Sequence, residues 1–155
     1  MMRAFIVAAA LTVLAGCGSG SSTGGLEAEG SYVIDLTTAQ VVPAPKPSSA
    51  TGAAAFILYS DRIEYQIAAQ AITAVTSAHI HNGATGVAGA AVATLFTTGN
   101  PVSPIGSFAT GAMLDANLPA GVTVASLKAL FASGNAYVDI HTVANTSGEL
   151  RGQIR

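Results

Sequence analysis

The sequence of 155 residues has little of what many protein sites are built from: one cysteine, three histidines and no tryptophan. A single cysteine cannot form a disulfide within the chain. Charged residues make up only 9% of the sequence, and the formal net charge is −2. This sparse charge, with no cluster of lysine and arginine, argues against nucleic acid as a partner, because nucleic-acid binding depends on clustered basic side chains.

The amino terminus has the pattern of a secretory signal. Arg3 precedes an apolar run over residues 4–14 that is shorter than the about 20 residues of a membrane-spanning helix. The run ends in Leu14-Ala15-Gly16-Cys17, which resembles the bacterial lipobox, in which the cysteine becomes the acylated first residue of the mature protein. We therefore expect a lipoprotein signal peptide over residues 1–16 and lipidation at Cys17. The alternative is an ordinary secretion signal with an incidental cysteine.

The lipobox resemblance implies a protein anchored in a bacterial cell envelope. Several acyl chains suffice for a stable membrane anchor, and lipoproteins of Gram-negative bacteria are generally carried to the outer membrane. Residues 17–30 are rich in Gly and Ser and predict a flexible tether between this anchor and one domain over residues 31–155. Whether that domain faces the periplasm or the cell surface stays open, as does an envelope or extracellular protein partner.

The domain itself is predicted to be all-β. Short alternating apolar runs are broken by Gly, Pro, Asn and Asp, a pattern typical of half-buried strands. One run, over residues 122–133, has helical spacing and is followed by Gly134 at a suitable C-terminal position. About eight strands and one short helix predict an antiparallel Greek-key, immunoglobulin-like β-sandwich or barrel. The predicted strands cover residues 31–42, 51–59, 62–70, 75–81, 90–98, 107–114, 135–142 and 149–154.

All three histidines lie in two of these strands. His79 and His81 are two residues apart, so they point to the same face of a strand, and His141 shares a face with Asp139 in the other strand. Three neutral imidazoles suit copper or zinc and leave a coordination position open. The alternative is that the histidines only form hydrogen bonds that hold loops.

Three charged side chains could support such a site. Asp139 could orient an imidazole from the second shell, or it could be a solvated strand residue. Glu149 and Arg151 share a face of the last strand, where they could take part in an ordinary cross-strand or loop salt bridge. Alternatively, Arg151 sets the electrostatic potential over the histidines.

Five motifs in order resemble the CHRD domain, which is named for chordin and is widespread in exported bacterial proteins. The resemblance covers residues 31–155 and implies a fold more than an activity. The motifs are Leu36-Thr37-Thr38-Ala39-Gln40 with Pro43, Thr51-Gly52, Ala78-His79-Ile80-His81-Asn82-Gly83, Gly134-Asn135-Ala136-Tyr137-Val138-Asp139-Ile140-His141-Thr142 and Gly148-Glu149-Leu150-Arg151-Gly152-Gln153-Ile154.

A weaker similarity is to copper–zinc superoxide dismutase. In that resemblance His79 and His81 match the paired copper ligands, His141 a later ligand and Arg151 the arginine that guides superoxide. The chain departs from the family in having no fourth histidine, no zinc ligand set and no disulfide. The sequence thus predicts a non-catalytic binding module for copper, with zinc also compatible. The alternatives are a structural or adhesive envelope protein without metal and a redox enzyme acting on superoxide.

Overall fold

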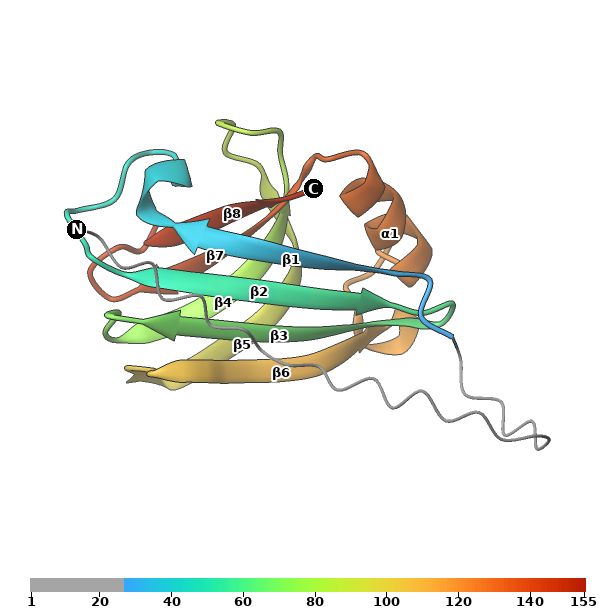
Figure 1. Cartoon of the computed structure of the whole chain (residues 1–155), viewed down its shortest axis with the longest axis horizontal. Helices are drawn as coiled ribbons and strands as arrows, with labels where there is room; N and C mark the ends of the chain where they lie inside the picture. The colour runs from blue at the N-terminus through green and yellow to red at the C-terminus, as the bar shows by residue number, and fades with distance from the viewer. Residues whose placement is uncertain (1–26) are drawn as a thin grey trace, which may run out of the picture.

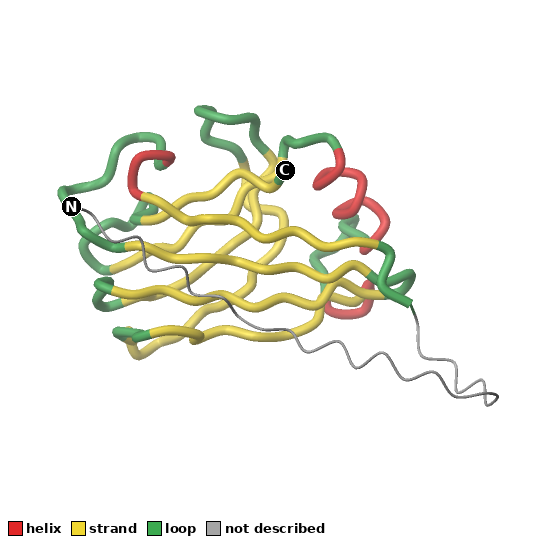
Figure 2. The backbone as a smooth tube through the Cα atoms, in the orientation of Figure 1, coloured by secondary structure: helices red, strands yellow, loops and turns green. Residues whose placement is uncertain are grey.

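The computed structural model describes residues 27–155. The predicted signal peptide, Cys17 and most of the predicted tether lie outside the described residues. The described chain consists mainly of strands (Figure 1, Figure 2), and none of its helices is long and apolar enough to span a membrane. In chain order the elements are β1 (Gly30–Thr37), η1 (Thr38–Gln40), β2 (Thr51–Leu58), β3 (Arg62–Gln70), β4 (Val75–Asn82), β5 (Ala90–Val102), β6 (Gly106–Leu114), η2 (Asp115–Asn117), α1 (Val124–Ala132), β7 (Ala136–Thr142) and β8 (Leu150–Ile154).

The eight described strands form one antiparallel sheet in the order β5-β4-β7-β8-β1-β2-β3-β6. This sheet folds over on itself, so that β1, β2, β3 and β6 lie in front of β4, β5 and β7 in Figure 1. Ala93 and Leu95 of β5 and Ala109 and Met113 of β6 therefore belong to the same core, although their strands are at opposite ends of the order. The predicted all-β sandwich or barrel with one short helix is confirmed.

The barrel is closed by side chains where β5 and β6 meet. Among the described strands these two have only one paired neighbour each. Phe96 of β5 packs edge-to-face on Phe108 of β6, with ring centroids 5.2 Å apart. The Tyr65 hydroxyl donates a 2.7 Å hydrogen bond from β3 to the carbonyl of Leu95 in β5. Pro101, which cannot donate to a ladder, is tolerated in β5 because this is an edge strand.

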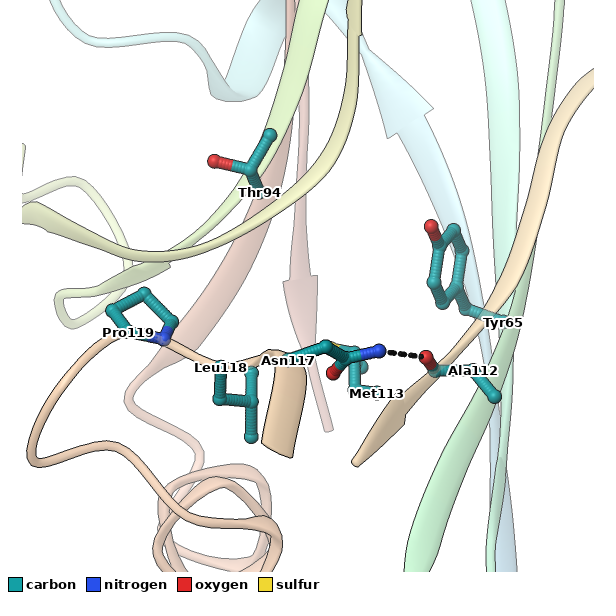
Figure 3. Close-up of a pocket in the computed structure, with 7 residues that line it drawn as sticks. All are labelled: Tyr65, Thr94, Ala112, Met113, Asn117, Leu118 and Pro119. Carbon is teal, nitrogen blue, oxygen red and sulfur yellow. Dashed lines mark hydrogen bonds between the residues drawn. The ribbon is translucent and has the colours of Figure 1, made fainter. Parts of the chain in front are cut away.

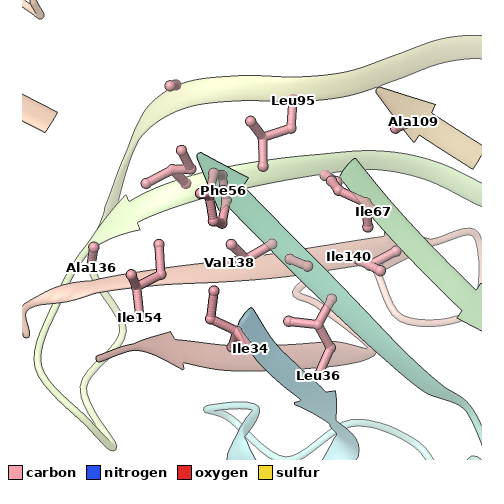
Figure 4. Close-up of a cluster of buried hydrophobic side chains, with 14 of the residues drawn as sticks. Ile34, Leu36, Phe56, Ile67, Leu95, Ala109, Ala136, Val138, Ile140 and Ile154 are labelled. Carbon is pink, nitrogen blue, oxygen red and sulfur yellow. The ribbon is translucent and has the colours of Figure 1, made fainter. Parts of the chain in front are cut away.

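The core is built by the alternation that the sequence predicts. Ala78 and Ile80 of β4 and Val138 and Ile140 of β7 are fully buried, and Figure 4 shows Val138 and Ile140 among the inward-facing side chains. Their neighbours in sequence therefore point to the opposite face of these two strands. This alternation places all three histidines outside the apolar core, on one face.

Helix α1 covers one end of this core. Thr123 caps its first turn by accepting a hydrogen bond from the backbone N–H of Ser126, and Gly134 ends it with a φ of +71°, as predicted. Phe131 then packs edge-to-face on Phe56 at 5.2 Å. The helix is a packing element.

Two strand boundaries differ from the prediction by more than one residue. The strand predicted over residues 31–42 ends at Thr37, because the chain turns into η1, where the Val41 N–H donates to the Thr38 carbonyl. The strand predicted over residues 90–98 continues to Val102, which pairs with Val75. The first difference matters for function, since the turn brings Gln40 against β8.

Candidate metal centre

The candidate site lies where β4 and β7 pair. The register places His79 opposite Asp139, and Ser77 opposite His141. Because residues opposite one another in a ladder share a face, His79, Asp139 and the neighbouring His81 and His141 all project from the outer face of the two strands. The three histidines that the sequence singled out are brought together.

Asp139 lies at the centre of the cluster. Its Oδ1 is 2.9 Å from Nε2 of His141 and 3.7 Å from Nδ1 of His79, and its Oδ2 is 3.1 Å from Nε2 of His81. One ligand atom from each of the four residues can be chosen so that all lie within 4.8 Å of one another. Asp139 is only 5% exposed, so the interpretation of this carboxylate as a solvated strand residue was wrong.

Two backbone carbonyls set the orientation of two imidazoles. Nδ1 of His81 is 2.8 Å from the carbonyl oxygen of Gly89, and Nδ1 of His141 is 2.9 Å from that of Thr146. A carbonyl oxygen only accepts, so each Nδ1 carries the proton and donates. In the neutral imidazoles the lone pair is then on Nε2, the atom that faces Asp139. Such hydrogen bonds from the distal ring nitrogen are typical of metal-binding histidines.

Four buried polar atoms in the cluster have no well-aligned hydrogen bond. They are Nδ1 of His79, Nε2 of His81, Nε2 of His141 and Oδ1 of Asp139. Most buried polar atoms in proteins are hydrogen-bonded, so a group of four such atoms needs an explanation. A single cation among them would satisfy all four. The donor set of three imidazole nitrogens and a carboxylate oxygen therefore fits a metal ion such as zinc or copper(II).

The electrostatics of the cluster favour a cation. Burial opposes ionisation of Asp139, but the nearby imidazoles of His141, His79 and His81 outweigh burial and hold the pKa of Asp139 well below its ordinary value. Burial also lowers the pKa of His141, yet the neighbouring Asp139 carboxylate raises it above its ordinary value overall. The carboxylate is thus ionised at neutral pH and attracts either a proton or a metal ion to the imidazoles.

Loop 83–89 covers one side of the cluster and depends on two glycines. A Cβ on Gly89 would lie 1.8 Å from the carbonyl oxygen of Asn82, and one on Gly83 would lie 2.9 Å from that of Val87. This close approach lets the Gly89 carbonyl reach His81, and the Gly89 N–H donates a 3.0 Å hydrogen bond to the Tyr137 hydroxyl oxygen. Only glycine permits the loop to pack this tightly.

Tyr137 connects the cluster to Arg151. Its ring is stacked on the imidazole of His81, with centroids 4.8 Å apart and planes 11° from parallel. The guanidinium of Arg151 lies 3.5 Å from the centroid of the same Tyr137 ring. Burial lowers the pKa of Arg151, which Tyr137 and Asp139 partly offset. Arg151 is thus beside the candidate site, separated from His81 by one aromatic ring.

Glu149 takes part in a different network. Its carboxylate accepts hydrogen bonds from the hydroxyls of Ser48 and Thr142, both at 2.6 Å, and from the amide of Asn145 at 2.9 Å. Neither Glu149 nor Arg151 forms an ion pair within residues 27–155, so the predicted cross-strand or loop salt bridge does not form there. Glu149 supports loop 143–149, whose Thr146 carbonyl orients His141.

The sequence did not indicate the parts of the site that loops supply. Nothing in the spacing of residues pointed to the carbonyls of Gly89 and Thr146 or to the stack of Tyr137 on His81. The one available signal was that Tyr137 alternates onto the face of Asp139 and His141.

A separate pocket lies away from the cluster. Its volume is about 380 Å³, and it opens beside the junction of β5 with β3 and β6 (Figure 3). No residue of the cluster lines it. The lining residues are Tyr65, Thr94, Ala112, Met113, Asn117, Leu118 and Pro119.

Comparison with known proteins gives one result. No curated protein and no solved structure matches the chain. The family model of the CHRD domain matches residues 32–154, which include all strands from β2 to β8 and every residue of the candidate metal centre. The match agrees with the five motifs that resemble this family, and by it the chain belongs to the CHRD domain family.

Proposed function

We propose that this CHRD domain is a metal-binding module with one mononuclear site. The ligands are Nδ1 of His79 and Nε2 of His81 and His141, and the Asp139 carboxylate neutralises the ion. The observation that supports this most strongly is the convergence of four buried ligand atoms without well-aligned hydrogen bonds. Proteins rarely leave such atoms unsatisfied.

The chemistry of the ligands limits the choice of ion. Three imidazoles suit zinc and copper, and the carboxylate favours the divalent ions Zn²⁺ and Cu²⁺ over Cu⁺, which prefers thiolate and thioether ligands. The carboxyl oxygens of Asp139 are within 3.7 Å of all three histidines, so this residue either binds the ion directly or accepts a hydrogen bond from a bound water.

The role we propose is metal binding without catalysis, at the bacterial envelope. The lipobox resemblance at Cys17 supports anchoring, which Cys17→Ser should abolish, so that the variant leaves the membrane fraction. Unchanged membrane fractionation of this variant would contradict the anchor.

The second candidate is a structural or adhesive envelope domain without metal. The contacts between Asp139 and the histidines favour this candidate, because protonated imidazoles could pair with the carboxylate and hold loops 83–89 and 143–149 in place. In that case protons on the imidazoles would neutralise the Asp139 carboxylate, as we propose that a metal ion does.

Titration calorimetry of the full chain with Zn²⁺ and Cu²⁺ distinguishes the two candidates. We expect one ion per chain, with binding lost in the double variant His79→Ala/His81→Ala and weakened by at least about tenfold in Asp139→Asn, which removes the charge next to the ion. The matched controls are Thr97→Ala and Asp35→Asn, which change exposed positions on β5 and β1. No binding to the unaltered chain, or equal binding to the double variant, would refute the metal site.

A further inference from the structure

Arg151 is a buried charge that the metal centre does not use. Its side chain belongs to β8 and the residue is only 2% exposed. No carboxylate of residues 27–155 lies within 4 Å of its nitrogens. Asp139 is its partner in the strand register, but that carboxylate is turned to the histidines. Tyr137 and Asp139 offset the burial of this guanidinium only in part, and a buried charge is costly unless a counterion compensates it.

We propose that Arg151 forms a binding site for a small oxyanion, a carboxylate or a phosphate, in the depression that it lines between η1 and loop 83–89. The depression has a volume of about 170 Å³, enough for such a group. Residues from three separate segments line it, namely Ala39, Gln40 and Val42, then Thr85 and Gly86, then Arg151 and Gln153.

The polar groups of this depression leave donors free and acceptors occupied. Gln40 accepts the backbone N–H of Gln153 with its Oε1, so its amide NH₂ remains available. Gln153 accepts from Arg151 with its Oε1 and donates its Nε2 to the carbonyls of Gly83 and Gly134. Nη2 of Arg151 donates to the Ala84 carbonyl and to Gln153, and the rest of the guanidinium fork can bind a ligand.

A surplus of donors around a guanidinium selects for anions. Charge-assisted hydrogen bonds from arginine to carboxylate or phosphate are about twice as strong as neutral ones, and the planar fork suits two oxygens at once. The oxyanion site is separated from the metal centre by the ring of Tyr137, which lies against both Arg151 and His81. The proposal therefore does not depend on a bound metal.

The test is an NMR titration of the full chain, without added metal, with sodium phosphate and separately with sodium acetate. Sodium chloride keeps the ionic strength constant. We expect saturable shifts of the Gly86 backbone amide and of the Gln40 side-chain amide with at least one of the two anions, and the tighter-binding anion distinguishes a phosphate site from a carboxylate site. Absence of saturable shifts with both anions would overturn the proposal.

Variants at two positions check that the charge of Arg151 is responsible. Arg151→Gln should weaken binding by at least about tenfold, the usual effect of losing a hydrogen bond from a charged group. Because Arg151 is buried, a matched pair at the exposed rim keeps the test informative if that variant does not fold. Ala39→Glu places a competing carboxylate at the mouth of the depression and should weaken binding, whereas Ala39→Lys should preserve or strengthen it. Equal affinities for the Ala39 pair would contradict an anion site here.

Discussion

At the scale of single residues, protons and the proposed metal ion would compete for the same nitrogens of the cluster. Imidazole must be neutral to bind metal. The Asp139 carboxylate raises the pKa of His141, so it stabilises whichever cation is present. The same contact would thus contribute to stability in the metal-free chain and to affinity for the proposed metal ion.

The raised pKa of His141 predicts how the stability of the metal-free chain depends on pH. A group whose pKa is raised on folding stabilises the fold fully below its unfolded value, about 6.5, and this contribution is lost as pH rises through the folded value. We therefore expect urea denaturation in the presence of a chelator to show a falling free energy of unfolding from about pH 6.5 upward. The decline should be absent in Asp139→Asn, and a flat or rising profile in the unaltered chain would contradict the contact.

The lowered pKa of Glu149 predicts that the free energy of unfolding depends on pH in the opposite direction, at lower pH. Burial disfavours its charged form, but hydrogen bonds from Ser48, Thr142 and Asn145 outweigh burial and lower its pKa. Its contribution is present above the unfolded value, about 4.3, and is lost as pH falls through the lowered folded value. Glu149→Gln should reduce the free energy of unfolding by about 1–3 kcal/mol at pH 7.

The matched control for this prediction is Glu64→Gln, because Glu64 hydrogen-bonds only to the neighbouring Arg62 among the described residues and is more exposed. We expect the loss in Glu149→Gln to shrink when chemical denaturation is repeated near pH 3. A loss that is equal at both pH values would show that charge is not the cause.

At the scale of elements, the site consists of a paired strand scaffold and two loops. Part of the scaffold was predictable, since the alternation placed His79 and His81 on one face of residues 75–81, and His141 and Asp139 on one face of residues 135–142. The pairing of β4 with β7, which brings these two faces together, is seen only in the structure. The loops were not predictable. The carbonyl of Gly89 reaches His81 only through the tight path of loop 83–89, and backbone carbonyls have no signature in a sequence.

The same distinction explains the failed predictions. The salt bridge expected for Glu149 and Arg151 is one of them. The two residues are two positions apart, so the sequence placed them on one face of a strand. In the structure the Glu149 carboxylate accepts a hydrogen bond from Asn145 in loop 143–149, while the Arg151 guanidinium lies over the ring of Tyr137. These partners belong to tertiary structure, which the local period of a strand does not specify.

The contact of loop 83–89 predicts the effect of Gly89→Ala. The added Cβ would lie 1.8 Å from the Asn82 carbonyl oxygen, so the loop must move and His81 loses its carbonyl partner. We expect lower zinc affinity, by roughly 10–100-fold as for other losses of a ligand's hydrogen-bond partner, measured by competition with a chromophoric chelator. Gly99→Ala, whose added Cβ meets no atom within 4 Å, is the control and should bind normally.

At the scale of the whole molecule, the proposed ligands lie on strands that hold the barrel together. β4 and β7 are adjacent, and β7 joins the half of the sheet that contains β4 and β5 to the half that begins at β8. An ion bound across β4 and β7 should therefore stabilise the whole domain against unfolding, and not only order a loop.

This linkage predicts a rise in thermal stability with metal. A ligand that binds only the folded chain stabilises it by RT ln(1 + [L]/Kd), about 2.7 kcal/mol when its concentration is a hundred times Kd. Calorimetric melting should shift to higher temperature with Zn²⁺ but not with Mg²⁺, which prefers oxygen ligands. A melting temperature that does not change with Zn²⁺ would contradict binding to the folded barrel.

The most direct measurement is X-ray absorption spectroscopy of the full chain loaded with one equivalent of Zn²⁺. The account predicts three imidazole ligands at about 2.0–2.1 Å, with oxygen completing the shell. In His141→Ala the number of imidazoles should fall to two. A spectrum without imidazole scattering, or one unchanged by His141→Ala, would show that His79, His81 and His141 do not hold the ion together.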